Sequence, residues 1–452
     1  MHKPEKLPVS KLIIFVIGQF GWSLASFGVV NLINYFYMPA EGAMESDFPI
    51  YIFQGSVLGL ATVIGLLNAG ARVFDGISDP LIAGWSDRSV SKFGRRRLFM
   101  AISVLPFALL SALVFFPPVV GDSGWNIAWV SVTIVLFYLF MTVYCVPYNA
   151  LIAEFTHTPT ERLNMSTAIS LAWAIGFALG SQVYSFQDNL EKSGLSSTEA
   201  FQRVMMGFAL ISFIAMLLPI VFIDENRYSG QHVSEESPFE GVFSTFKNKN
   251  FRYFITGDLT YWLGLTFATS GMNYYVTLLL EQDASKSSFY SMIMFAISFL
   301  LYVPVNLASK RFGKKPVMVL GFVVYSLLFL MIFFMGENMG IPVTWQAGIM
   351  VVFLAIPVAI FGILTTAFIA DEVEADGRET GNYKAGTYFA VRTFTMKLGV
   401  SLANLVFPSL LLFGKSTENP FGVRLTGLAA FVFCVLGMIA FLQYKEREFD
   451  GE

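Results

Sequence analysis

Twelve long apolar segments constrain how this chain can fold. Each approaches or exceeds the about 20 mainly apolar residues that a helix needs to cross a bilayer. Charged residues make up 13% of the chain, whereas soluble domains carry roughly 25%. These features predict an all-α membrane protein with twelve transmembrane helices, near residues 12–38, 57–83, 98–117, 127–153, 165–187, 204–223, 253–280, 288–307, 317–335, 343–370, 386–413 and 421–443.

The lysines and arginines between these segments predict the orientation. If both termini are cytoplasmic, the outer loops hold few of the 29 basic residues, namely Lys192, Arg203, Lys286, Lys415 and Arg424. Basic residues concentrate in cytoplasmic loops. We therefore expect a multi-pass protein of the cell (inner) membrane with cytoplasmic termini. Residues 1–11 are short and polar, so the first span is expected to be an uncleaved anchor.

The longest inner polar segment indicates two halves. Residues 224–250 carry Ser, Glu, Gly, Pro and Lys without a periodic apolar stripe, which is typical of a linker. A basic sequence follows both the second and the eighth span, at 86–96 and 309–315. This internal repeat predicts duplicated halves. The expected domains are a six-helix bundle over 1–223, the linker over 224–250 and a second six-helix bundle over 251–452.

The sequence offers no motif for enzymatic chemistry. It contains neither a Gly-x4-Gly-Lys-Ser/Thr loop for ATP nor a His-Glu-x-x-His zinc motif. The two cysteines lie in apolar runs, and a net charge of −3 suggests no nucleic-acid partner. The three histidines lie in predicted cytoplasmic loops, which excludes a histidine proton relay. We expect no enzyme and no cofactor beyond a coupling ion, so transport would use an ion gradient or be passive.

Two carboxylates lie inside the second span. Asp75 and Asp79 stand at i and i+4 on one helix face, with the Ser78 hydroxyl beside them. Carboxylates at membrane depth are costly and usually functional, and oxygen ligands suit Na⁺ or H⁺. Asp75, Ser78 and Asp79 are therefore expected to bind the cation, with Asp75 and Asp79 as the metal ligands. The alternative is a salt bridge from Arg72, one turn before Asp75.

Three further charges lie in the second half. Lys397 is too deep in span 11 to reach the interface, so we expect it to face the cavity and pair with Asp75 or Asp79. Arg392 would bind an anionic substrate group or form a cytoplasmic ion pair. Asp258 near the start of span 7 would be stabilised by the helix dipole, or would contact substrate or a gate.

Other charges are expected at the cytoplasmic gates. Asp87, Arg88 and Arg95 follow span 2, where they would fasten helix ends to neighbouring loops. Asp371 and Glu372 end span 10, where an acidic cluster would hold the inner gate against basic loops.

Several of these motifs resemble one family. The sequence Asp-Gly-Ile-Ser-Asp-Pro at 75–80, the span 4 sequence at 146–151 with Glu154, and the segment from Ala370 to Gly399 are similar to the glycoside–pentoside–hexuronide:cation symporters related to melibiose permease. The resemblance implies the major facilitator fold, with two pseudo-symmetric six-helix bundles rocking about a midplane site. It also implies a span 11 lysine near the cation and a monomer.

The chain departs from this family where galactoside is bound. Ser23 and Cys145 replace two acids, Thr167 replaces an arginine and Asn149 a tryptophan, which argues against a melibiose-like ligand. The family's asparagine between the cation aspartates is Ser78. Together with Ser23, Asp258 and Arg392, the substrate candidates are then the uncharged or aromatic residues Trp22, Asn31, Tyr148, Asn149, Trp173, Trp262, Asn273 and Tyr274. Each of these could instead serve helix packing or an interfacial aromatic belt.

These observations predict a secondary active transporter in the lipid bilayer. We expect Na⁺- or H⁺-coupled symport of a small organic solute, a sugar, glycoside or sugar acid, by alternating access. One alternative is a Na⁺-dependent symporter of a lysophospholipid-like or other amphipathic solute, since eukaryotic lysophospholipid symporters share the span 2 aspartates and the span 11 lysine. A second is a non-transporting membrane sensor with the same fold. A passive uniporter would ignore Na⁺ and pH.

Overall fold

A computed structural model describes residues 5–40, 48–57, 59, 61–89, 91–156, 159–229, 245–336, 339–380 and 385–446. Most of the predicted linker and all three histidines lie outside these residues. The chain forms two compact units. The first comprises Met1–Pro39, Asp47–Gln54 and Gly70–Glu235, and the second comprises Ala40–Ser46, Gly55–Ala69 and Glu236–Glu452.

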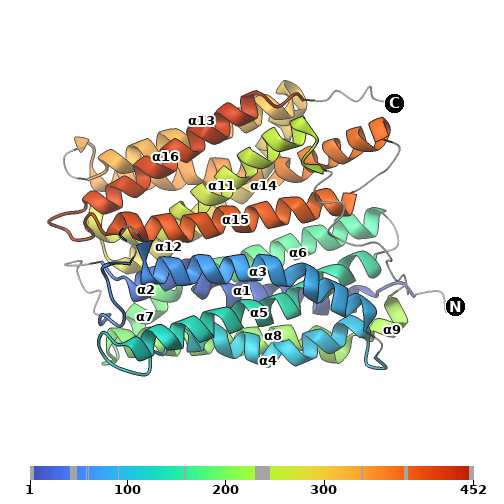
Figure 1. Cartoon of the computed structure of the whole chain (residues 1–452), viewed down its shortest axis with the longest axis horizontal. Helices are drawn as coiled ribbons and strands as arrows, with labels where there is room; N and C mark the ends of the chain where they lie inside the picture. Colours follow the sequence, from blue (N-terminus) through green and yellow to red (C-terminus); the bar gives the residue numbers. More distant parts are fainter. Residues whose placement is uncertain are drawn as a thin grey trace. The chain divides into compact units, whose positions relative to one another are not determined.

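Unit 1 is a helical bundle (Figure 1). Its helices are α1 (Val9–Asn31), α2 (Ile33–Tyr37), α4 (Arg95–Leu113), α5 (Gly124–Glu154), α6 (Pro159–Gly180), α7 (Val183–Glu191), α8 (Ser197–Phe222) and α9 (Glu225–Tyr228), with the part of α3 (Val63–Arg88) that follows Ala69. Helix α1 packs closely against α6 and α8. At Gly21 an added Cβ would lie 2.9 Å from the Ser212 carbonyl oxygen of α8. Small residues permit this close approach between membrane helices.

Unit 2 is a second bundle (Figure 1). It contains the first part of α3, the antiparallel strands β1 (Ser56–Val57) and β2 (Ala61–Thr62), and the helices α11 (Lys249–Tyr274), η1 (Tyr275–Leu279), α12 (Ala284–Phe312), α13 (Lys314–Phe334), α14 (Val343–Thr380), α15 (Ala385–Leu411) and α16 (Phe421–Leu442). Helix α16 packs on both α11 and α13. At Gly437 of α16, an added Cβ would collide with the Thr260 hydroxyl of α11, so only glycine fits.

Ten helices among the described residues are long and apolar enough to span a membrane. Helices α3 and α11 have 26 residues each, about 39 Å at 1.5 Å per residue, but are not among these ten. They carry Asp75, Asp79 and Asp258, whose charges lower the hydropathy. The number of twelve spans stays a prediction.

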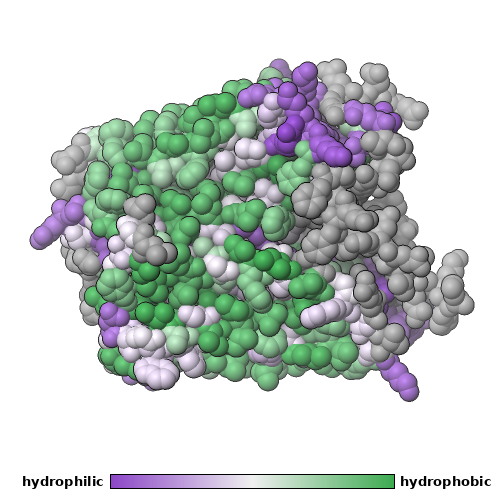
Figure 2. All heavy atoms as spheres, viewed as in Figure 1, coloured by the Kyte–Doolittle hydropathy of each residue, from purple (hydrophilic) through white to green (hydrophobic). Residues whose placement is uncertain are grey.

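The surface is largely apolar. Figure 2 shows hydrophobic residues over most of one face. On α12, Leu300, Val303 and Leu307 are 77%, 67% and 62% exposed, and their spacing forms a stripe along one side of the helix. Such a surface would aggregate in water but is stable in lipid. The chain is therefore a membrane protein.

Candidate cation site and ion pairs at the helix starts

Two carboxylates and two hydroxyls meet between α3 and α5 in unit 1. The Thr142 hydroxyl lies 2.7 Å from Oδ1 of Asp75 and 3.2 Å from Oδ1 of Asp79. The Ser78 hydroxyl donates to the Asp75 carbonyl at 3.0 Å and lies 3.4 Å from the Thr142 hydroxyl. Asp75 is fully buried and Asp79 half-buried. The structure thus brings Asp75, Ser78 and Asp79 together and adds Thr142.

Thr142 is a site residue that the sequence interpretation missed. Its helix, α5, is almost uniformly apolar, so periodicity gives this hydroxyl no special status. A threonine inside an apolar span, near the family-like sequence at 146–151, was the available signal. Only the packing of α5 against α3 shows that its side chain reaches the carboxylates.

Arg72 also contacts this cluster. Its Nη1 lies 3.5 Å from Oδ2 of Asp75, and the two side chains are almost wholly buried. The Tyr138 ring lies 4.5 Å from the guanidinium carbon, a cation–π contact. The salt bridge offered as an alternative is therefore present beside the hydroxyl cluster. Arg72 therefore balances the charge of Asp75.

Lys397 lies on α15 of unit 2, where its side chain is half-buried. Its predicted pairing with Asp75 or Asp79 would join the two units and stays a prediction. In unit 2 the structure instead pairs Arg392 with Asp258, at 3.1 Å between Nε and Oδ2. The helix-dipole explanation of Asp258 is wrong. Helix α11 begins at Lys249, more than two turns earlier, and the dipole acts only within the first turn.

The remaining substrate candidates divide by accessibility. Ser23 donates to the Trp173 carbonyl at 2.6 Å, and Tyr148 donates to the Phe15 carbonyl at 2.6 Å. Those hydroxyls tie α1 to α6 and α5. Buried in the same way are Asn31, Asn273 and Tyr274. Accessible surface remains on Trp22, Asn149, Trp173 and Trp262.

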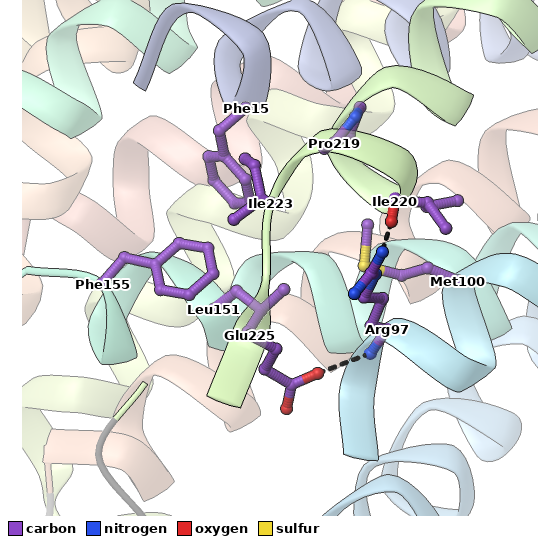
Figure 3. A pocket seen from close by; sticks show the side chains of 9 residues that line it. All are labelled: Phe15, Arg97, Met100, Leu151, Phe155, Pro219, Ile220, Ile223 and Glu225. Carbon is purple, nitrogen blue, oxygen red and sulfur yellow. Dashed lines mark hydrogen bonds between the residues drawn. The ribbon is translucent and has the colours of Figure 1, made fainter. Parts of the chain in front are cut away.

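At the end of α5 in unit 1, Glu154 binds two arginines. It pairs with Arg95 at 2.8 Å and Arg96 at 2.7 Å, the first residues of α4. Glu225 accepts the backbone N–H groups of Arg96 and of Arg97, the latter at 2.8 Å. Figure 3 shows Glu225 beside Arg97, whose guanidinium also donates to the Ile220 carbonyl. Two acids thus hold the start of α4, and a carboxylate there complements the helix dipole.

Unit 2 repeats this arrangement. Asp371 of α14 pairs with Lys314 at 2.5 Å. Glu446 accepts the backbone N–H groups of Lys314 and Lys315, at 2.7 and 3.0 Å, where α13 begins. The basic repeat in the sequence is therefore matched by a pair of acids in each unit, Glu154 with Glu225 and Asp371 with Glu446. Glu225 and Glu446 were not among the residues predicted from the sequence.

The other residues predicted at the gates are Glu372, Asp87 and Arg88. Glu372 is fully buried and accepts the side-chain amides of Asn248 and Asn250, at 3.0 and 2.5 Å. These contacts fix the start of α11. Asp87 and Arg88 end α3, and their side chains lie outside the part of the chain that the structure describes.

The comparisons agree with this architecture. The sequence matches the MFS/sugar transport protein family over residues 14–443. The isoprimeverose transporter of Lactiplantibacillus pentosus is 22% identical over 375 residues, which cover 82% of this chain and 76% of that protein. The sodium-dependent lysophosphatidylcholine symporter 1 of Xenopus tropicalis is 22% identical over 488 residues, covering 98% and 88%.

A solved structure extends the agreement to the fold. The crystal structure of a D-xylose-proton symporter superimposes with a TM-score of 0.70 at 12% identity, over 96% of each chain. This likeness establishes the major facilitator fold. The predicted resemblance to cation-coupled sugar symporters is thereby confirmed, and the chain belongs to the MFS/sugar transport protein family.

Proposed function

We propose that this chain is a Na⁺- or H⁺-coupled symporter of a small organic solute, a sugar, glycoside or sugar acid. It would work by alternating access, as a monomer, in the cell (inner) membrane with both termini cytoplasmic. The observation that carries the proposal is the cluster of two carboxylates and two hydroxyls around Thr142. The symporters among its relatives support cation coupling of a small solute.

Accessibility favours Asp79 as the group that takes the cation. Asp79 is half-buried, whereas Asp75 is fully buried and pairs with Arg72. The Thr142 hydroxyl has one proton, so it donates to only one carboxylate at a time. A bound Na⁺ would find hydroxyl and carboxylate oxygens at Asp79.

The test is thermal stability of the purified protein with sugars, uronic acids and lysophospholipids, with Na⁺ exchanged for K⁺ at constant ionic strength. Ligands of the native state raise its apparent stability. We expect sugar or sugar-acid stabilisation that requires Na⁺, or low pH for H⁺ coupling, and that Asp79→Asn abolishes. Binding that ignores both Na⁺ and pH would contradict cation coupling. Binding without counterflow in vesicles would instead identify a sensor.

One observation favours an amphipathic solute as the second candidate. A pocket of about 280 Å³, open to the surface, lies between α1 and α6, and its lining is entirely apolar. Such a space suits an acyl chain, because apolar surfaces exclude water. The lining residues are Leu12, Ile13, Val16, Ile17, Phe20, Ala168, Ala172 and Ile175. Stabilisation by lysophospholipid alone, lost on filling the pocket with Ala172→Phe, would favour this candidate over a sugar.

A further inference from the structure

The ion pair between Asp258 and Arg392 lies deep inside unit 2. Nε and Nη2 of Arg392 approach the two carboxylate oxygens of Asp258 at 3.1 and 3.4 Å, so the guanidinium meets the acid side-on. The pair lies well along both helices, roughly 10–14 Å from their first residues at 1.5 Å per residue. Ionisable groups at such depth are costly and usually functional.

Holding α11 against α15 does not require this pair. Phe267 and Phe407 already pack edge-to-face at 5.4 Å, and Gly399 lets the α15 backbone approach the Leu259 carbonyl. Replacing a buried ion pair with apolar residues is often neutral or stabilising. The two charges therefore call for a role beyond packing.

Asp258 and Arg392 differ in how accessible their side chains are to a solute. The Asp258 side chain is 1% exposed, so a solute cannot reach its carboxylate, whereas Arg392 is 20% exposed. A guanidinium has five N–H donors in one plane. Asp258 accepts hydrogen bonds from Nε and from Nη2 of Arg392. Within the described residues, no acceptor contacts Nη1 of Arg392. The Trp262 ring lies 5.7 Å from the guanidinium carbon.

We infer that Arg392 binds the carboxylate of an acidic solute through this open edge. Asp258 is a positioning residue that fixes the guanidinium plane, and Trp262 offers an aromatic surface to the rest of the solute. A carboxylate matches two parallel guanidinium donors, and a neutral hydroxyl does not. The inference rests on the proposed function and narrows the solute to a sugar acid.

The test compares matched ligands on the purified full-length protein. Methyl β-D-glucuronide and methyl β-D-glucoside differ only in carrying a carboxylate or a hydroxymethyl group, as do galacturonic acid and galactose. Thermal-shift titrations in Na⁺ should give roughly tenfold to hundredfold tighter binding of each acid, the range of a charge-assisted hydrogen bond. Arg392→Gln should abolish this preference for the acid.

Two further variants keep the result interpretable. Arg424 of α16 donates to the Phe333 carbonyl, so Arg424→Gln removes another partly buried arginine of unit 2 and should leave the acid preference intact. The double variant Asp258→Asn with Arg392→Gln leaves no unpaired charge. If Arg392→Gln alone fails to fold, this double variant is tested in its place, and it must lose the preference for acids.

The outcomes separate this inference from the proposed function. Equal binding of acids and neutral glycosides, no binding of any acid, or a preference that survives Arg392→Gln would overturn the role of Arg392. Na⁺-dependent binding of neutral glycosides alone would keep the symporter and reject the acidic solute. An acid preference that is indifferent to Na⁺ and pH would keep Arg392 and reject cation coupling.

Discussion

At the scale of the residue, Thr142 gives the sharpest prediction. Its hydroxyl lies within hydrogen-bonding distance of both Asp75 and Asp79. Thr142→Val removes the hydroxyl and nearly keeps the shape. A hydrogen bond to a charged group contributes about 1.5–3 kcal/mol, so the apparent affinity for the coupling ion should fall roughly tenfold or more. Na⁺ titration of thermal stability, or a pH titration if H⁺ couples, measures this.

Thr133 is the matched control on the same helix. Its hydroxyl donates to the Trp129 carbonyl of α5 itself, so Thr133→Val should leave the ion affinity unchanged. Thr142→Ser keeps a hydroxyl and should retain most of the affinity. An unchanged affinity in Thr142→Val would show that the hydroxyl serves packing, and the ion would then have to be sought elsewhere on α3.

At the scale of the element, the start of α4 depends on Glu225. Burial raises the pKa of this carboxyl, although the backbone N–H groups of Arg97 and Arg96 oppose the shift. A raised carboxyl pKa means that the folded state holds the proton more tightly than the unfolded state. Its contribution to stability is therefore fully present below the ordinary glutamate pKa and is lost as pH rises through the raised value.

The experiment is the apparent melting temperature of wild type and Glu225→Gln between acidic and neutral pH. The melting temperature of Glu225→Gln should decline less than that of wild type as pH rises, because the glutamine side chain cannot ionise. Glu225→Ala removes the cap altogether and should cost about 0.5–2 kcal/mol at acidic pH, where the contribution of Glu225 is fully present. Asp224→Asn is the control, since Asp224 is an exposed neighbouring acid. Identical pH profiles for wild type and Glu225→Gln would show that other groups set the pH dependence.

At the scale of the whole molecule, some features could be predicted from the sequence and others could not. The helix period alone places Asp75 and Asp79 on one face, and the basic repeat indicates the two halves. The contacts of Thr142, Glu225 and Glu446 depend on which helices pack together, and no local pattern encodes that. The partner of Asp258 was missed for the same reason: Arg392 follows it by 134 residues.

The orientation of the molecule is a prediction that rests on charge alone. The repeated acid–base clusters at Glu154 and Asp371 involve the basic starts of α4 and α13. Basic residues resist transfer across the membrane, so these helix starts should be cytoplasmic. A fluorescent protein fused after Glu452 should then mature in bacterial cells, and alkaline phosphatase fused there should be inactive. Phosphatase inserted beside Lys415 should be active. The reverse pattern would invert the topology and would place the start of α15, with Arg392, toward the outside.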